Sequence, residues 1–197
     1  ITLKKAWSAA ALTDTASVIL KRGAATVDTL ASTADTATET DTDVTPFTAN
    51  VGETLNLWET VGGGNAGRYT ATLACDNSVT VGGTGDFVVP ATATNCTVTN
   101  TRKTTTITLK KAWSTAAVND TASVILKRGA ATVDTLASTA NTTTETDTDV
   151  TPFTANVGET LNLSETLGGA NAGQYTATLA CDNSVTVGGT GDFVVPA

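Results

Sequence analysis

Short runs of alternating apolar and polar residues follow one another along the chain, separated by glycine, asparagine and aspartate. Alternation with a period of two is typical of half-buried strands, and the separating residues favour turns. No stretch has a convincing helical period. For the first half of the chain we predict strands near residues 1–7, 16–22, 26–31, 45–51, 54–60, 68–75, 78–81, 86–89 and 94–101. Nine short strands with frequent turns indicate an all-β fold of the sandwich class.

A duplication predicts the domain organisation. The segment 1–7 (ITLKKAW) returns at 107–113, and aligning residues 1–91 with 107–197 leaves about nine differences. A repeat of about 100 residues has the length of a complete β-sandwich domain. We therefore expect tandem Ig-like sandwiches.

The expected boundaries follow from this alignment. They are a first sandwich at 1–103, a linker at 104–106 and a second sandwich at 107–197. The second repeat stops at the counterpart of Ala91, so we expect it to lack a closing strand. The missing strand could be supplied by the rest of a longer array or by a neighbouring chain.

Three polar residues are predicted to lie on apolar strand faces. Lys5, Glu59 and Asn100 each share a face with apolar residues two positions away. One interpretation places each at a strand end, where it reaches water. The other is an intramolecular isopeptide bond. In that reaction a buried, neutral lysine amine attacks the asparagine side chain, a protonated glutamic acid assists, and ammonia leaves.

The motifs around these residues resemble the Cna B-type (SpaA-like, prealbumin-like) domains of bacterial pilins and adhesins. The relevant segments are ITLKK at 1–5, LWET at 57–60 followed by Tyr69, and TVTNT at 97–101. The resemblance implies a prealbumin-like sandwich with Lys5 as amine, Glu59 as acid and Asn100 as acceptor.

The second repeat has equivalents of two of these residues, Lys111 and Glu165. Two features depart from the family pattern. A glycine-rich loop at 62–69 replaces the usual Pro-x-Gly-Tyr turn, and cysteines are added.

The three cysteines predict one disulfide. Cys75 ends one expected strand and Cys96 begins the last one on its inward face, so we expect these two to pair. Cys181 is the counterpart of Cys75. The rival pairing, Cys96 with Cys181, would apply if the strand at 94–101 completed the second repeat. A disulfide implies an oxidising compartment.

Composition excludes several classes of function. The net charge of −8 disfavours nucleic acid and anionic membrane as partners. Histidine is absent, and no nucleophile–base pair is evident, so we expect neither an enzyme nor a cofactor or metal site. Glu39, Asp41 and Asp43 alternate with threonine. We interpret them as a solvated, charged edge strand, with calcium binding as the less favoured alternative.

Near-identical repeats favour a structural role, because spacing units need only fold and link. We expect a stalk or fibre repeat of an extracellular, cell-surface adhesin, pilus or filament. Its partners would be neighbouring repeats or subunits, including strand donation to the second repeat. The alternative is an adhesin module that binds a glycan or host protein. That role would lie at Trp58, Arg68 and the 62–67 loop, where the repeats differ.

Overall fold

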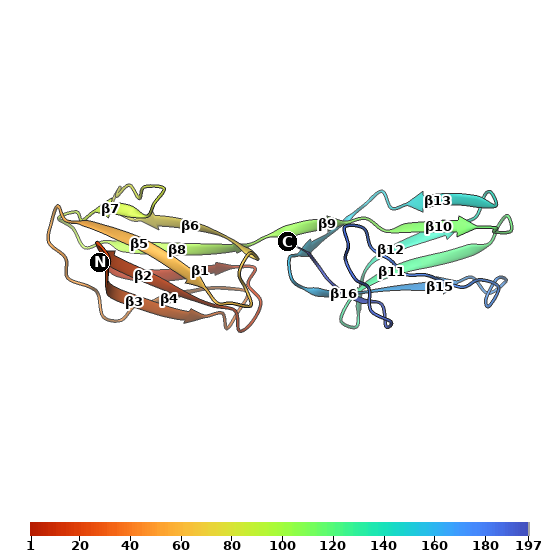
Figure 1. Cartoon of the computed structure of the whole chain (residues 1–197), viewed down its shortest axis with the longest axis horizontal. Coiled ribbons are helices and arrows are strands. Elements are labelled where there is room, and N and C mark those ends of the chain that lie inside the picture. Colours follow the sequence, from red (N-terminus) through yellow and green to blue (C-terminus); the bar gives the residue numbers. More distant parts are fainter. Residues whose placement is uncertain (197) are drawn as a thin grey trace. The chain divides into compact units, whose positions relative to one another are not determined.

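A computed structural model describes residues 1–196 of the chain. The chain divides into two compact units, Ile1–Lys103 and Thr104–Ala197. In the described residues every regular element is a strand (Figure 1), which confirms the all-β class. A helix long and apolar enough to cross a membrane is absent from the described part.

Unit 1 has two four-stranded sheets in a sandwich-like arrangement. Their orders are β4-β1-β8-β6 and β3-β2-β5-β7. The strands are β1 (Thr2–Ser8), β2 (Thr15–Arg22), β3 (Ala25–Thr33), β4 (Thr38–Thr42), β5 (Thr54–Val61), β6 (Tyr69–Cys75), β7 (Asp86–Val88) and β8 (Asn95–Arg102). The last strand, β8, lies in the middle of its sheet, parallel to β1 and antiparallel to β6.

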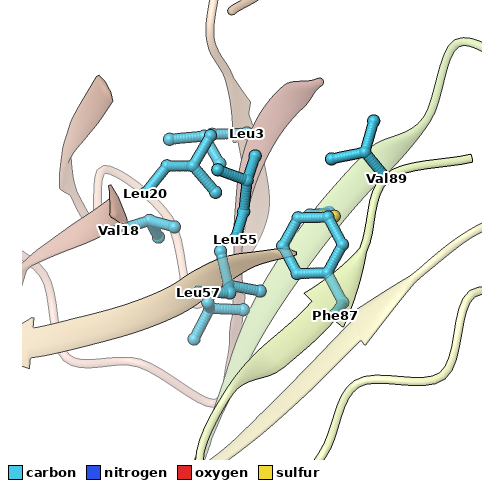
Figure 2. Close-up of a cluster of buried hydrophobic side chains, with 9 residues drawn as sticks. Leu3, Val18, Leu20, Leu55, Leu57, Phe87 and Val89 are labelled. Atoms are coloured by element: carbon cyan, nitrogen blue, oxygen red, sulfur yellow. The ribbon is translucent and has the colours of Figure 1, made fainter. Parts of the chain in front are cut away.

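The alternation in the sequence places one face of each sheet in the core. β1 and β2 alternate buried with partly exposed positions. The buried side chains from both sheets form one apolar cluster (Figure 2): Leu3, Val18, Leu20, Leu55, Leu57, Phe87, Val89, Cys96 and Val98. A second cluster lies further along β1 around Trp7 and Tyr69, whose rings meet edge to face with centroids 5.3 Å apart. Between the two clusters, one inward position of β1, residue 5, belongs to neither of them.

Unit 2 repeats most of this arrangement with fewer paired strands. Its sheets are β12-β11-β15-β16, β10-β13 and β14-β9. The strands are β9 (Thr104–Ile107), β10 (Lys110–Ser114), β11 (Thr121–Arg128), β12 (Ala131–Thr139), β13 (Thr144–Thr148), β14 (Phe153–Asn156), β15 (Thr160–Leu167) and β16 (Asp192–Val194). Among the described residues no strand takes the place that β8 has in unit 1.

Residues 104–106, expected as a linker between the repeats, pair with β14 as part of β9. Two of the predicted strands are absent. The strand expected at 78–81 does not form, since Asn77 and Ser78 have φ values of 56° and 60°, which break an extended chain. The strand expected at 45–51 is also absent from unit 1, although its counterpart forms β14 against β9 in unit 2.

Candidate functional site

The three polar residues predicted to face the core lie between the two apolar clusters of unit 1. Lys5 follows Leu3 on the inward face of β1, and Asn100 follows Val98 on β8. Glu59 enters from β5 in the facing sheet. The structure therefore brings the three together from both sheets, in a polar layer surrounded by hydrocarbon.

The Lys5 amine is completely enclosed. The residue has 0% exposure, and its Nζ donates a hydrogen bond of 2.8 Å to the Ala6 carbonyl. Nζ also lies 3.9 Å from the centre of the Trp7 ring and 3.5 Å from Glu59 Oε1. Burial lowers the pKa of Lys5 from 10.5 to about 8, against the opposing effects of Glu59 and Asp41. At neutral pH a much larger fraction of the Lys5 amine is therefore neutral and nucleophilic than for a lysine in water.

Glu59 is the complementary group. Its side chain is 6% exposed, and burial raises its pKa above the usual 4.5, while Lys5 and Asn100 act in the opposite direction. A carboxyl group in this state takes up a proton readily. The pair can exchange a proton, so that a neutral amine faces a neutral acid.

Asn100 carries an unsatisfied amide. It has 0% exposure and lies near enough to Glu59 to lower the pKa of that carboxyl, yet neither its Nδ2 nor its Oδ1 has a partner at normal hydrogen-bond geometry. A buried polar group without a partner costs about 1–3 kcal/mol, so the position needs an explanation. In the parallel register Asn100 pairs with Trp7 and Val98 with Lys5, which makes the asparagine a diagonal neighbour of the lysine on the same face.

In its described residues unit 2 has the lysine and the acid but no strand equivalent to the one that carries Asn100. Lys111 Nζ and Glu165 Oε1 are 2.7 Å apart, closer than the 3.5 Å of the Lys5 pair. The Lys111 side chain is 14% exposed, whereas that of Lys5 is fully buried. Lys111 and Glu165 therefore form a direct, largely buried ion pair.

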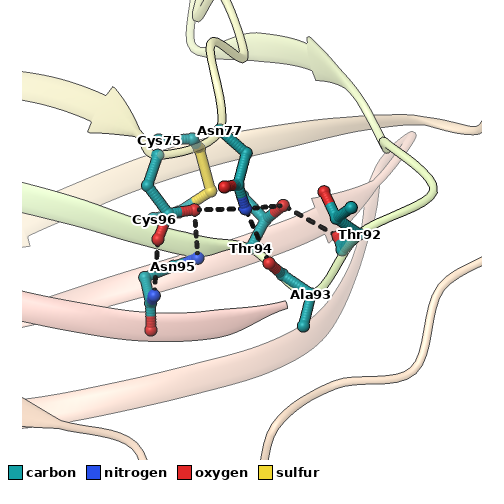
Figure 3. The surroundings of a disulfide bond; sticks show 8 residues. Cys75, Asn77, Thr92, Ala93, Thr94, Asn95 and Cys96 are labelled. Atoms are coloured by element: carbon teal, nitrogen blue, oxygen red, sulfur yellow. Dashed lines mark hydrogen bonds between the residues drawn. A yellow bond between two sulfur atoms is a disulfide. The ribbon is translucent and has the colours of Figure 1, made fainter.

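A disulfide joins the strands that flank this layer. Cys75 on β6 and Cys96 on β8 are directly opposite in the antiparallel register and are bonded (Figure 3), as the sequence predicts. The adjacent turn is held by Asn77, whose amide donates to the Ala93 carbonyl at 2.7 Å. Cys181 is a partly buried free thiol, so the rival pairing of Cys96 with Cys181 is excluded in this structure.

The acidic threonine-rich segment forms strand β4 at the edge of its sheet, as the charged-edge interpretation predicts. Asp41 pairs with Lys5 across the β1–β4 register and raises the pKa of its amine. Sequence reasoning missed this contact, although the alternation of carboxylates in the segment was a signal for it. Within residues 1–196 no group of three or more potential ligands could hold a metal ion.

The positions that differ between repeats lie outside this layer. Trp58 points away from the core, as predicted, and is 48% exposed. Lys21 Nζ lies 5.4 Å from the centroid of its ring. Arg68 and the 62–67 loop follow β5 and lead into β6. These residues form no common site with Lys5.

Comparison of the chain with family models, with curated proteins and with solved structures finds no match.

Proposed function

We propose that the chain is part of a structural stalk or fibre at a bacterial cell surface, built from prealbumin-like sandwich repeats that are stapled covalently. The observation that carries this proposal is the enclosed layer of Lys5, Glu59 and Asn100 between the sheets. A buried charge pair beside an unsatisfied amide is a poor way to stabilise a core. The same arrangement is well suited to forming an amide bond between the lysine and the asparagine.

The proposed bond joins Lys5 Nζ to Asn100 Cγ. The neutral amine attacks the amide carbon, and protonated Glu59 polarises the amide oxygen by donating a hydrogen bond. The new C–N bond forms as the original one breaks, and the Asn100 nitrogen leaves as ammonia with a proton from the amine. The reaction consumes no water and no oxidant, and it ends after one turnover.

Such a bond suits a load-bearing role because of where it lies. It would join the first strand, β1, to the last strand, β8, so force applied through the two ends of unit 1 would pass through the crosslink. The Cys75–Cys96 disulfide then adds a second staple between β8 and β6. Together they favour an extracellular, oxidising setting.

Single-molecule stretching of the whole chain tests this function. We expect unit 2 to unfold and lengthen under load, and unit 1 to give no extension between Lys5 and Asn100. The Lys5→Arg variant cannot form the amide and is the matched control, because it should release all of unit 1 except the loop that the Cys75–Cys96 disulfide closes. The same extension of unit 1 in the unmodified chain, at forces typical of uncrosslinked sandwiches, would contradict the proposal.

The second candidate is a ligand-binding adhesin module, which exposed Trp58 favours. A half-exposed tryptophan on a sheet face is a common platform for a sugar ring or a peptide. A glycan array probed with the chain tests it. The control is Trp58→Ser, since serine is what repeat 2 has at the equivalent position 164. Glycan binding by the parent chain that Trp58→Ser loses would support this function. If the parent chain binds no glycan, the structural role is favoured.

A further inference from the structure

The space that β8 fills in unit 1 is an open groove in unit 2. It has a volume of about 440 Å³ and runs between residues 105–110, which lead into β10, and residues 180–185. Its floor is formed by apolar side chains of the facing sheet: Val124, Leu126, Leu163 and Phe193. Their counterparts in unit 1 are Val18, Leu20, Leu57 and Phe87, which pack with Cys96 and Val98 of β8.

The walls of the groove have unpaired edges. In unit 1, β8 lies between β1 and β6 and hydrogen-bonds to both. In unit 2, β10 pairs only with β13 among the described residues. Residues 175–181 have the same sequence as β6, YTATLAC, yet they form no strand. The same sequence is a strand where it pairs with β8 and irregular where it has no such partner. Residues 175–181 are therefore expected to become a strand when a partner strand binds beside them.

We propose that this groove is a binding site for one strand of the β8 type, with the sequence of Asn95–Arg102, which lies parallel to β10 and forms a disulfide with Cys181. The chain's own β8 cannot serve, because Cys96 is already bonded to Cys75 within unit 1. The occupant must have a free cysteine, and we take it to be the equivalent segment of a further repeat.

The β8 register explains why this sequence fits. In unit 1, Cys96 pairs with Leu3 and Cys75, and Val98 pairs with Leu73. The same register in unit 2 places the incoming cysteine opposite Cys181 and beside Leu109, and the incoming valine opposite Leu179. Leu109 and Cys181 both line the groove. A polar residue at the valine position would face the apolar floor and could not be satisfied.

The covalent step is thiol–disulfide exchange. With a small-molecule disulfide as oxidant, the Cys181 and strand thiols lose two protons and two electrons. The oxidant becomes two thiols. When the strand carries an activated mixed disulfide, the Cys181 thiolate attacks the strand sulfur and the activating thiol leaves with the bonding electrons and a proton. Burial raises the pKa of Cys181, so the unassisted thiol is a slow nucleophile and strand docking supplies the acceleration.

The test uses the whole chain and a synthetic peptide with the sequence of residues 91–103, its cysteine activated as a pyridyl disulfide. We expect a one-to-one adduct at Cys181, formed about 100-fold faster than with a scrambled peptide of the same composition, as docking raises the effective concentration. Residues 175–181 should gain protection from hydrogen exchange. Replacing the peptide's valine by aspartate should remove the acceleration without touching the protein's fold.

The Cys181→Ser variant separates docking from bond formation. It should form no adduct but should still gain exchange protection at 175–181 with the unscrambled peptide. Equal reaction rates for the native-sequence and scrambled peptides, with no change in protection, would overturn the inference. Disulfide-linked dimers through Cys96 and Cys181 in the absence of peptide would also overturn it, because a second copy would then be the donor.

Discussion

Lys5 Nζ lies 3.5 Å from Glu59 Oε1 across the space between the two sheets, and both side chains are almost completely withdrawn from water. Burial drives the two pKa values toward each other, down to about 8 for the amine and upward for the acid. A pair of this kind stores little stability as an ion pair. Its neutral form is the one that can react with the adjacent amide.

The pH profile of crosslinking follows from these shifts. The reactive form has a neutral Lys5 and a protonated Glu59. Between the two pKa values its population is constant. As the pH rises there, the neutral fraction of Lys5 increases by the same factor by which the protonated fraction of Glu59 decreases. Below the raised pKa of Glu59 the amine stays charged, and above about pH 8 the acid stays ionised, so the rate falls on both sides. Refolding the denatured, uncrosslinked chain at a series of pH values, with mass spectrometry of quenched samples, checks this.

A rate that rises steadily above pH 9 would show that Glu59 does not act as an acid. Chain that has not yet reacted is obtained by synthesis in segments or by recovery directly under denaturing conditions.

The disulfide should stabilise unit 1 measurably. Its loop spans 21 residues, for which the chain-entropy account gives about 3 kcal/mol. We expect the double variant Cys75→Ala with Cys96→Ala to unfold at lower temperature in the unit 1 transition only. Unit 2, whose Cys181 is free, is the internal reference in the same calorimetric trace. An equal shift of both transitions would contradict this assignment.

The natural differences between repeats offer a stabilising change. Thr13 has a φ of 70°, a left-handed conformation that is costly for a β-branched residue. Its counterpart Asn119 has nearly the same φ, 74°, and asparagine tolerates it well. Thr13→Asn should therefore stabilise unit 1 by about 1 kcal/mol. The reverse change, Asn119→Thr, should destabilise unit 2 similarly. Denaturant titration of both variants measures the two effects, and opposite signs from those given would refute the account.

A carboxylate pair predicts a second pH effect. Burial and the neighbouring Asp43 raise the pKa of Asp28 above 3.8. The Oδ2 atoms of both residues are buried without a hydrogen bond. A raised folded-state pKa means that stability is present below the unfolded value and is lost as the pH rises through the folded one.

Asp28→Asn removes this titration. We expect the variant to melt at a higher temperature than the parent at pH 7, with the difference vanishing as the pH falls below about 4. Thermal unfolding followed by circular dichroism across this range is the measurement. Asp134→Asn at the equivalent position of unit 2, where the pKa is also raised, should behave in the same way. A variant less stable at pH 7 would show that the carboxylate is stabilising.

Local alternation was sufficient to predict the inward direction of Lys5, Glu59 and Asn100, because side-chain direction in a strand depends only on counting by two. It could not predict which strands pair. Asp41 approaches Lys5 through the β1–β4 register, which no local pattern specifies. The sequence YTATLAC is a strand at 69–75 and irregular at 175–181. Whether such a segment forms a strand therefore depends on a pairing partner as well as on its own residues.

The intact mass of the reduced and denatured chain tests the central claim most directly. Reduction removes the contribution of the disulfide, so any remaining deficit reports the Lys5–Asn100 bond. We predict a mass one ammonia below that of the sequence, with Lys5 and Asn100 recovered in one branched peptide after digestion. Glu59→Gln should restore the full mass, whereas the matched change Glu165→Gln in unit 2 should leave the deficit unchanged. The full mass of the unmodified sequence in the parent chain would contradict the crosslink.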